Sequence, residues 1–517
     1  MPLHQRDASA LRAGTGLDAP SLPRAEVRET HTAIVFFVGD RAYKLKKPVD
    51  LGFLDYTTAA ARRVACDREI TLNRRFAPDV YLGLGEIRSP DAEEPEPLVV
   101  MRRMPADRRL SQLIREGAAV DNVLRAVARQ LATRHADAPR SREVDEQGTR
   151  DALSSRWESS FAQVRAMADN GALPDGVAEV ERLVRRYLAG RKHLFDTRIE
   201  QGRIVDGHGD LLAEDIFCLD DGPRVLDCLE FDDHLRYVDG LDDAAFLAMD
   251  LEQLGAPEAA AYFLAQYSEY SGDLAPPSLW HHYVAYRAFV RAKVSLIQAR
   301  QGALDAEAAS RRLVTTTLRH LRTSAVGLTL VGGLPGSGKS TLSGALADRL
   351  GVTLLSSDRL RKELAGIRPE ESAAAGYGEG LYTAEWSDKT YSTLLDHASV
   401  LLSSGESVVL DATWSDARQR EAAVRVAERT GADLVALHCQ APWDVSAARL
   451  NARAPGASDA DLAVATVMAS KEPLWPEAVT IDTSGPLESS VVQALAAVRP
   501  WGTGQAPVFR RPYMEAD

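Results

Sequence analysis

The pattern of hydrophobic and polar positions changes twice along the chain. Between residues 34 and 104 the runs IVFFVG, RAYKLKK, YLGLGEI and PLVVMRRM predict strands, and TTAAARRVACDREITLNRRF has the spacing of a helix. From about residue 106 to residue 322 helical periodicity dominates, as in GVAEVERLVRRYLAGRKHLF. We therefore expect a small sheet carrying one helix, followed by a mostly helical body.

Two short strand-like runs interrupt this helical body. DIFCL and RVLDCLEF flank the turn DDGP over residues 215–231, and they predict a hairpin. The acidic segment HGDLLAED, residues 208–215, leads into this hairpin from a long helical pattern.

The second change comes at GLTLVGGLPGSGKSTLSGALADRL, residues 327–350, which reads as a strand, a glycine-rich turn and a helix. The apolar runs VTLLSSD, ESVVLDAT, DLVALHC and AVTID then alternate with helical segments, which is typical of a parallel sheet. We expect an α+β first domain over residues 26–322, with a small lobe of about 30–104 and a helical lobe of about 105–322, and an α/β second domain over 325–500. Residues 1–25 and 501–517 are expected to be a flexible arm and tail.

Composition narrows the class of protein. The 517 residues are 45% hydrophobic and 26% charged, with no apolar run of membrane-spanning length and no apolar block of a signal peptide at the start, so a cytoplasmic protein without membrane contact is expected. A net charge of −13 disfavours nucleic acid as a partner and favours small substrates. The four cysteines lack the C-x-x-C spacing of a zinc site. The sequence leaves the oligomeric state open.

Lysine is scarce, since only nine of the 61 basic residues are Lys. In a chain that uses Arg so freely, a retained Lys suggests a role that a planar guanidinium cannot fill. Lys44, Lys46 and Lys47 lie together in AYKLKK, and Lys339 lies in the glycine-rich turn.

The glycine-rich turn fits the phosphate-binding pattern G-x-x-x-x-G-K-[ST] in its strand–turn–helix context. Its glycines let backbone N–H groups face phosphate oxygens, and the following helix adds its positive end. We expect Lys339 to reach the β- and γ-phosphates of ATP and Ser340 to hold Mg²⁺. The remaining expected nucleotide-binding residues of this loop are Gly333, Gly336, Ser337, Gly338 and Thr341.

Three further positions point to phosphoryl transfer in this second domain. Asp358 follows a predicted strand at the rim where ligands of such sheets bind, and it is placed either to accept a substrate hydroxyl proton or to cap the next helix. Asp411 ends another apolar strand and is expected near Mg²⁺. Arg449 and Arg453 share one helix face and either close over the phosphoryl group or form a solvated basic face. Residues 327–483 resemble the small P-loop kinases that phosphorylate sugars, antibiotics or nucleic-acid ends, a group that includes gluconate-kinase-like proteins and the zeta-type toxins.

The first domain contains a second set of candidate residues in a consistent order. Lys44 lies on a predicted strand, Glu69 on the following helix, Asp210 in HGDLLAED, and Asp227 after a short strand. A Lys on phosphates paired with a helix Glu, a loop Asp facing a hydroxyl and a second Asp on Mg²⁺ form the working set of a protein-kinase-like site. Each residue alone could instead be an edge charge, a surface residue or a turn former.

The segments YKLKKPVDLGFLDYTT, REITLNRRFAPDVYLG and DGHGDL resemble the aminoglycoside-phosphotransferase-like family of the protein-kinase-like fold, in its bacterial branch often fused to a P-loop kinase. This resemblance implies that Lys44 binds phosphate with Glu69 as its partner, that Asp210 is the catalytic aspartate and that Asp227 binds the metal. PLVVMRRMP would lie beside the adenine. The chain departs from the family in lacking a glycine-rich loop and in having Asp215 where the family has a metal-binding Asn; Asp is an equally good oxygen ligand for Mg²⁺.

Together these features predict an ATP- and Mg²⁺-dependent phosphotransferase with two sites, which acts on hydroxyl groups of small molecules. A nucleotide-sensing protein with a pseudokinase first half and an ATPase second half is the main alternative. A nucleic-acid end kinase is a further one, against which the acidity of the chain counts.

Overall fold

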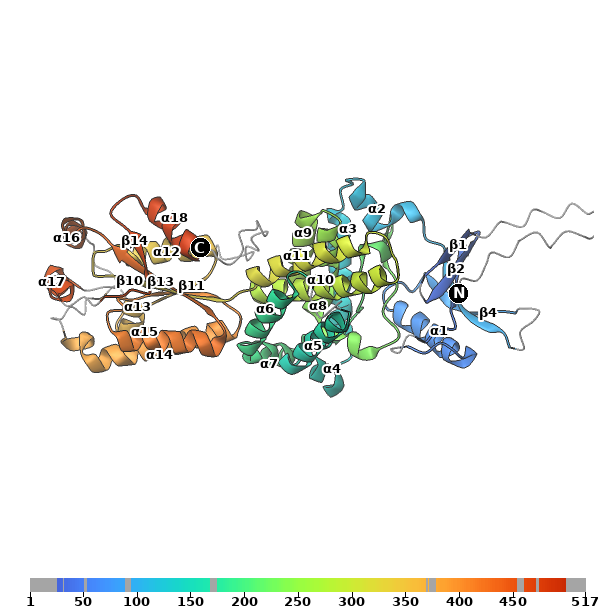
Figure 1. Cartoon of the computed structure of the whole chain (residues 1–517), viewed down its shortest axis with the longest axis horizontal. Coiled ribbons are helices and arrows are strands. Elements are labelled where there is room, and N and C mark those ends of the chain that lie inside the picture. The colour runs from blue at the N-terminus through green and yellow to red at the C-terminus, as the bar shows by residue number, and fades with distance from the viewer. Residues whose placement is uncertain are drawn as a thin grey trace, which may run out of the picture. The chain divides into compact units, whose positions relative to one another are not determined.

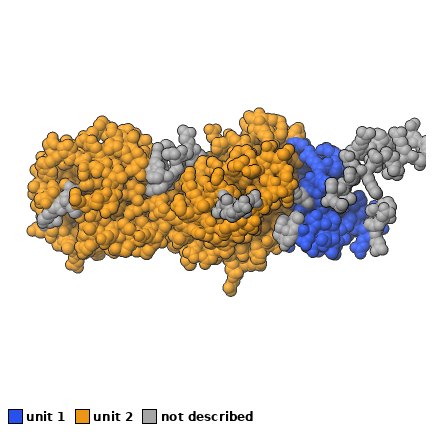
Figure 2. All heavy atoms as spheres, in the orientation of Figure 1, with its two compact units in different colours: residues 1–106 blue, residues 107–517 orange. Residues whose placement is uncertain are grey.

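The computed structural model describes residues 26–30, 32–50, 54–88, 94–167, 174–368, 371, 378–452, 460–470 and 474–498. The arm and tail expected at residues 1–25 and 501–517 lie outside these ranges. The chain divides into two compact units, residues 1–106 and residues 107–517 (Figure 2). No described helix has the length and apolar character needed to cross a lipid bilayer.

Unit 1 is a five-stranded antiparallel sheet with one helix (Figure 1). The strand order is β1-β2-β3-β5-β4. The helix, α1, follows β3 and precedes β4 along the chain. Thr58 caps α1 by accepting a hydrogen bond from the Ala61 N–H. The elements are β1 Glu26–Glu29, β2 Ala33–Val38, β3 Arg41–Lys46, α1 Ala59–Asn73, β4 Tyr81–Ile87 and β5 Glu96–Arg102.

The hydrophobic pattern predicted four of these strands but missed β1. Its sequence is EVRE, and all four residues are exposed on the edge of the sheet, where charged side chains discourage pairing with another chain. Gly39 lies in the two-residue turn between β2 and β3, because β2 ends at Val38 and β3 begins at Arg41. The segment that links β1 to β2, of which the structure describes residues 30 and 32, contains no glycine in its sequence, in keeping with a chain without a glycine-rich loop.

Unit 2 begins with a helical region, residues 107–323, which contains two small two-stranded sheets. The apolar helices α8 and α10 pack together at its centre, with residues such as Leu247 and Ala288 fully buried. The helices are α2 Leu110–Arg115, α3 Asp121–Asp137, α4 Arg142–Gln147, α5 Arg150–Ala166, α6 Val177–Ala189, α7 Lys192–Glu200, α8 Gly240–Gln253, α9 Pro257–Ser271, α10 Pro277–Arg300 and α11 Ala306–Thr323. The strands are β6 Ile204–Asp206, β7 Ile216–Leu219, β8 Gly222–Val225 and β9 Tyr237–Asp239.

The hairpin predicted over residues 215–231 forms, but it is shorter than its apolar pattern suggests. Strand β8 pairs with β7 and ends at Val225, whereas the run RVLDCLEF predicted a strand as far as Phe231. The strand ends early because Asp227 has a φ of 65°, in the left-handed region that a strand cannot contain. The turn is also tighter than predicted, because Gly222 and Pro223 already belong to β8.

The rest of unit 2, residues 327–498, is here called the P-loop region. Its five strands are all parallel, in the order β11-β12-β10-β13-β14, and helices cover both faces of the sheet (Figure 1). One face packs on α12 and α18 through a core that includes Val331, Leu346 and Leu495. The elements are β10 Gly327–Gly332, α12 Lys339–Leu350, β11 Thr353–Ser356, α13 Ser357–Leu364, α14 Ala384–Ser403, β12 Val408–Asp411, α15 Ala417–Thr430, β13 Asp433–Gln440, α16 Trp443–Ala452, α17 Leu462–Ser470, β14 Val479–Asp482 and α18 Leu487–Val498.

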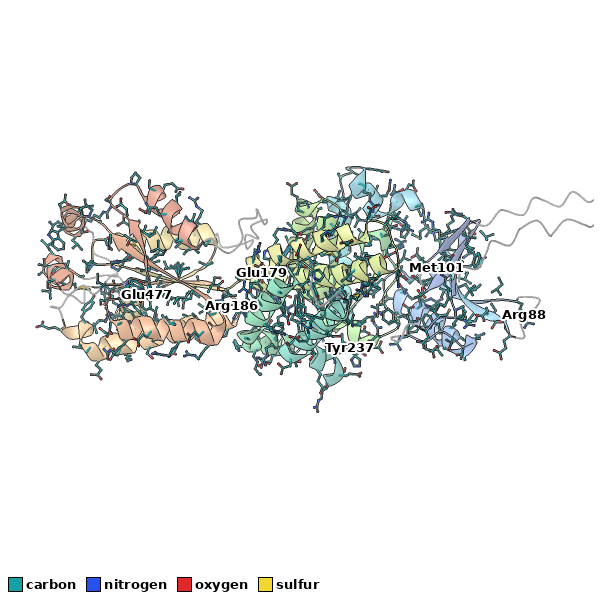
Figure 3. All side chains as sticks on the ribbon, in the orientation of Figure 1. Arg88, Met101, Glu179, Arg186, Tyr237 and Glu477 are labelled. Carbon is teal, nitrogen blue, oxygen red and sulfur yellow. The ribbon has the colours of Figure 1, made fainter. Side chains whose placement is uncertain are left out.

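The helical region and the P-loop region are joined by polar contacts as well as by the chain. Arg186 of α6, labelled in Figure 3, pairs with Asp433 and donates to the Ala432 carbonyl at 2.9 Å. The buried Arg191 donates to the Thr430 carbonyl at 2.5 Å. Contacts this close explain why the two regions form one compact unit.

Candidate active sites

The phosphate loop of the P-loop region consists of residues 333–340, which follow β10 and include the first two residues of α12. Gly333, Gly336 and Gly338 have φ values of 139°, 81° and 87°, which side chains with a Cβ rarely adopt. The surroundings also exclude side chains here, because a Cβ at Gly336 would lie 2.6 Å from the Ser446 carbonyl oxygen. The loop therefore has the backbone conformation in which successive N–H groups can face an anion.

Lys339 of this loop and Asp411 of β12 are both buried, and the charge of Lys339 acts on the Asp411 carboxylate. Lys339 starts α12 and is 9% exposed, and Asp411 ends β12 in register with Val331 of β10. Burial raises the pKa of Asp411, although the charge of Lys339 and a hydrogen bond from Ser340 oppose that shift. Asp411 Oδ1 is buried, and no described residue donates a hydrogen bond to it. A buried carboxylate oxygen beside the Ser340 hydroxyl fits a bound Mg²⁺, because hard cations prefer oxygen ligands.

Asp358 follows β11, and its charge acts on Asp411. It belongs to the first turn of α13, and the residue before that helix, Ser356, is in register with Asp411. The negative charge of Asp358 adds to the raised pKa of Asp411. The alternative that Asp358 caps the helix is wrong, because the helix begins at Ser357 and Ser356 occupies the capping position.

Arg449 also reaches the phosphate loop. Its Nη2 donates to the Thr483 carbonyl at 2.7 Å, and its Nη1 lies 3.4 Å from where a Cβ of Gly338 would be. Nη1 is buried, and no described residue accepts a hydrogen bond from it. Arg453, the expected second arginine of this helix face, lies outside the described residues.

Two residues that sequence reasoning missed shape this site. Trp414 is 1% exposed and has a φ of 55°, an uncommon conformation for so large a residue. The Tyr391 hydroxyl holds this turn, because it bonds to the Thr413 hydroxyl at 3.0 Å and accepts from the Trp414 N–H at 3.2 Å. The run DATW carries no local signal for such a turn.

In unit 1, both predicted lysines pair with the predicted glutamate. Lys44 Nζ lies 2.9 Å from Glu69 Oε1, and Lys46 Nζ lies 2.8 Å from Glu69 Oε2. Glu69 is fully buried, Lys46 is 3% exposed and also lies over the Tyr56 ring, and Lys44 is 16% exposed. Lys44 is thus the more accessible ammonium group, as a phosphate-binding role requires, and Lys46 supports the shared carboxylate.

In unit 2, the acidic loop, residues 207–215, is fixed by Asp243 of α8. Asp243 is fully buried and accepts hydrogen bonds from the backbone N–H groups of His208 and Gly209 at 2.7 and 2.8 Å. His135 Nε2 contacts the same carboxylate at 3.0 Å, and His135 Nδ1 contacts the Tyr267 hydroxyl at 2.8 Å. Burial alone would raise the pKa of Asp243, but the bonds from His135 and His208 lower it strongly, so the carboxylate stays ionised.

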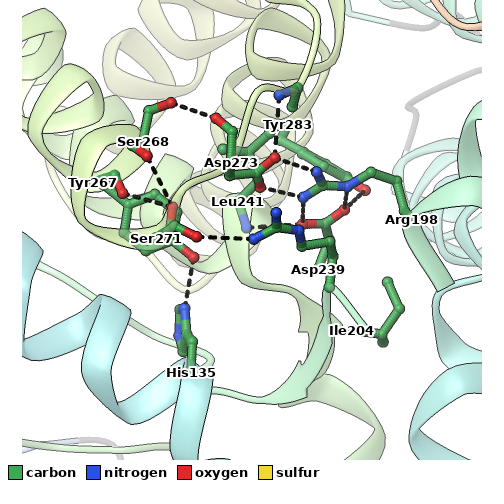
Figure 4. A network of polar contacts seen from close by, with 12 residues as sticks. His135, Arg198, Ile204, Asp239, Leu241, Tyr267, Ser268, Ser271, Asp273 and Tyr283 are labelled. Carbon is green, nitrogen blue, oxygen red and sulfur yellow. Dashed lines mark hydrogen bonds and ion pairs between the residues drawn. The ribbon is translucent and has the colours of Figure 1, made fainter. Parts of the chain in front are cut away.

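A second buried network fixes the start of α8 (Figure 4). Arg198 forms a bidentate pair with Asp239, at 2.6 and 2.7 Å, and it also binds Asp273. Asp239 in turn caps α8 by accepting from the Leu241 N–H at 2.9 Å. The helix that carries Asp243 is therefore anchored at its N-terminal cap.

Asp210 follows the two anchored N–H groups in the acidic loop and is partly exposed. The pKa of Asp210 is raised to about 6, and the largest cause is the burial of its carboxyl group. The charges of Asp227 and Asp250 also raise this pKa, whereas those of Arg291 and Arg287 lower it. A carboxyl group that titrates near neutral pH is suited to accept a proton.

Asp215 and Asp227 lie at the same end of the β7–β8 hairpin. The Asp215 carbonyl accepts a hydrogen bond from the Leu226 N–H at 3.0 Å, and the exposed Asp227 follows directly. Among the described residues no group of three or more acidic, His or Cys side chains is arranged to hold a metal alone. Two carboxylates suit Mg²⁺, which proteins often bind through one or two carboxylates together with substrate phosphates.

These observations define the class of protein. Residues 26–323 have the elements of a protein-kinase-like fold, and residues 327–498 have the parallel sheet and phosphate loop of a P-loop nucleotide-binding fold. Residues 328–474 match a family model described as an AAA domain. The two-part fold predicted from the sequence is thus confirmed.

The chain is 44% identical to a Mycobacterium tuberculosis protein, described as uncharacterized protein Rv2004c, over 472 residues that make up 91% of this chain and 95% of that protein. The chain belongs to the same family as this mycobacterial protein. Two solved structures are also similar. One is a sugar kinase from Janibacter sp. HTCC2649, with a TM-score of 0.27 and 18% identity, covering 34% of this chain and 94% of that one. The other is the GDP and kanamycin complex of APH(2")-IIia, with a TM-score of 0.37 and 16% identity, covering 57% of this chain and 93% of that one.

Proposed function

We propose that the protein is an ATP- and Mg²⁺-dependent phosphotransferase that phosphorylates hydroxyl groups of small molecules, with one site in each half. The observation that carries this proposal is the phosphate loop with its buried Lys339 and the buried Asp411 on the neighbouring strand. A nucleoside triphosphate and its metal require a lysine, a hydroxyl group and a carboxylate. The loop and β12 supply these groups, and one oxygen of the carboxylate is buried without a hydrogen-bond donor among the described residues.

In the P-loop region, Lys339 and the loop N–H groups would hold the β- and γ-phosphates. Ser340 and Asp411 would hold Mg²⁺, which neutralises phosphate charge when it is bound. Asp358 would accept the proton of the acceptor hydroxyl. The acceptor oxygen then forms a bond to the γ-phosphorus, the bond from that phosphorus to the β–γ bridging oxygen breaks, and ADP leaves. Arg449 has a buried donor at the loop and would bind the nucleotide there.

In the N-terminal half, Asp210 would play the part of Asp358. Its raised pKa supports this role, and the anchoring of His208 and Gly209 by Asp243 would hold it in position. In unit 2, Asp215 and Asp227 would bind Mg²⁺. In unit 1, Lys44, paired with Glu69, would bind phosphate. The acceptor of each site, and the division of the chain into domains at residues 323–326, stay predictions.

The test measures ADP release from ATP with a panel of hydroxyl compounds. Four proteins are compared: wild type, Lys339→Ala, Asp210→Asn and the double variant. We expect each single variant to lose a different subset of acceptors and the double variant to lose all of them. Activity that survives in the double variant would refute both sites. ATP binding without transfer to any acceptor would instead favour the nucleotide-sensing alternative.

A further inference from the structure

The face of α10 towards the acidic loop carries arginines that the proposed chemistry does not use. Arg287 and Arg291 are one helical turn apart, so their side chains leave the same face of α10. Arg287 is 5% exposed, and its Nε donates to Asp242 Oδ1 at 2.7 Å. Its Nη1 reaches the Gly209 carbonyl oxygen at 3.5 Å. This guanidinium therefore lies against the backbone just before Asp210.

Arg291 follows Arg287 by one turn of α10 and is partly exposed. Its charge bears more strongly on the Asp210 carboxylate than that of Arg287 does, and it bears on Asp250 as well. Asp250 Oδ2 accepts a hydrogen bond from the Ala213 N–H at 2.9 Å. The charge of Arg291 thus acts both on Asp210, the proposed catalytic aspartate, and on Asp250, which holds the end of the acidic loop.

Several donors of these arginines remain unused. Within the described part of the chain, the Arg291 guanidinium has no hydrogen bond and no ion pair, and the same is true of Arg115, whose charge also bears on Asp250. Arg287 Nη2 is buried, and it too has no acceptor among the described residues. An arginine that served only to neutralise Asp210 or Asp250 would be expected to pair with it, because such pairs form short, charge-assisted hydrogen bonds.

We propose that Arg291, supported by Arg287 and Arg115, binds an anionic group of the acceptor, so that the compound phosphorylated at Asp210 carries a carboxylate or a phosphate beside its hydroxyl. A guanidinium presents its donors in a planar fork that matches both groups. The same positive charges disfavour a cationic acceptor. This inference rests on the proposed function of the N-terminal half, and it adds the chemical class of the substrate.

The test uses the full-length Lys339→Ala protein, so that the remaining transfer reports on the N-terminal half. The acceptors are D-glycerate, D-gluconate and glycerol 3-phosphate, with glycerol and D-glucitol as neutral partners. We expect Arg291→Gln to lower kcat/KM for charged acceptors by about 10- to 100-fold, mainly through KM, since a hydrogen bond to a charged group contributes about 1.5–3 kcal/mol. Neutral acceptors should change by less than about twofold. Arg312→Gln, an exposed residue of α11, is the matched control and should change neither. A preference between the carboxylate and phosphate acceptors identifies the anionic group.

An equal loss for charged and neutral acceptors, carried by kcat, would assign Arg291 to the transferring phosphoryl group and overturn the proposal. Calorimetric titration with the three charged compounds and inorganic phosphate separates this inference from the proposed function, because binding needs no turnover. If the charged probes bind and Arg291→Gln weakens them about tenfold while no acceptor is phosphorylated, the anion site stands and the proposed function fails. If no charged probe binds, or if Arg291→Gln binds them equally well, the anion site is refuted.

Discussion

The phosphate loop of the P-loop region and the acidic loop of the helical region are held in place by different parts of the chain. The phosphate loop is a run of eight residues that supplies its own glycines, Lys339 and Ser340, and Asp411 is added by the neighbouring strand of one sheet. The acidic loop depends on Asp243 and Asp250 of α8, and His135 of α3 reaches the same Asp243 carboxylate. The first loop is built mainly from backbone conformation, and the second from buried charge.

This difference determines which change each loop tolerates. A loop shaped by positive-φ glycines keeps its conformation when a side-chain hydrogen bond is lost, because the backbone preference remains. A loop whose N–H groups bond to a buried carboxylate loses its support when that charge is removed. Substitutions at the phosphate loop should therefore mainly lower its phosphoryl-transfer activity. Substitutions of the buried charges around the acidic loop should mainly disturb the conformation of that loop.

The largest expected effect is on the chemistry of the phosphate loop. Replacing Lys339 by Ala removes a charge that opposes the raised pKa of the buried Asp411, and it removes the ammonium group expected at the phosphates. We expect kcat/KM at this site to fall by at least about 100-fold, a typical loss for one preorganised group that stabilises transition-state charge. Transfer in an Asp210→Asn background measures this. Lys389→Ala, on the exposed side of α14 beside Trp386, is the control.

The next effect is on the order of the acidic loop. Asp243→Asn keeps the shape of the side chain but removes the negative charge of the carboxylate that bonds to His208, Gly209 and His135. Removing one partner from such a buried network costs about 3–5 kcal/mol. Hydrogen exchange of the amides of residues 207–215 should accelerate accordingly, while that of residues 333–340 stays unchanged.

The matched change in the other loop is Thr483→Val, which removes a hydroxyl that donates to the Ser337 carbonyl at 2.6 Å. We expect it to cost only about 1 kcal/mol, the usual net value of a neutral hydrogen bond. A larger acceleration of exchange in Thr483→Val than in Asp243→Asn would contradict the contrast between the two loops.

The pH dependence should also separate the halves. Asp210 must be deprotonated to accept a proton, and its raised pKa of about 6 places this requirement within the accessible pH range. In the Lys339→Ala protein we therefore expect kcat/KM to fall about tenfold per pH unit below pH 6 and to level off above it. A pH–rate profile between pH 4.5 and 8 checks this, and a flat profile would exclude Asp210 as the base.

The sequence predicts those features whose residues are close together in the chain. The phosphate loop, its sheet and the order Lys44, Glu69, Asp210, Asp227 could be read from local patterns, and the structure pairs Lys44 with Glu69 as predicted. The support of the acidic loop could not, because His135 and Asp243 are separated by 108 positions and leave no periodic signal. The bonding of Lys46 to the same glutamate was likewise invisible, since strand alternation places two lysines on one face without showing which carboxylate they share.

The smallest expected effect concerns Asp215, and it tests whether having Asp where the aminoglycoside-phosphotransferase-like sequences have Asn is a loss of function. Asp215 is the last residue of the acidic loop, directly before β7, and its backbone is fixed by the bond from the Leu226 N–H, which any side chain permits. Asp215→Asn keeps one oxygen ligand and removes one negative charge near Asp227. Because Mg²⁺ accepts either oxygen, we expect activity of the N-terminal half in the Lys339→Ala protein to be preserved or raised, with a change of less than about fivefold. Titrating Mg²⁺ at saturating ATP measures this, with Asp221→Asn in the exposed hairpin turn as the control. Complete loss in Asp215→Asn alone would show that the second charge is required, and that this half uses its metal differently from the asparagine-containing kinases it resembles.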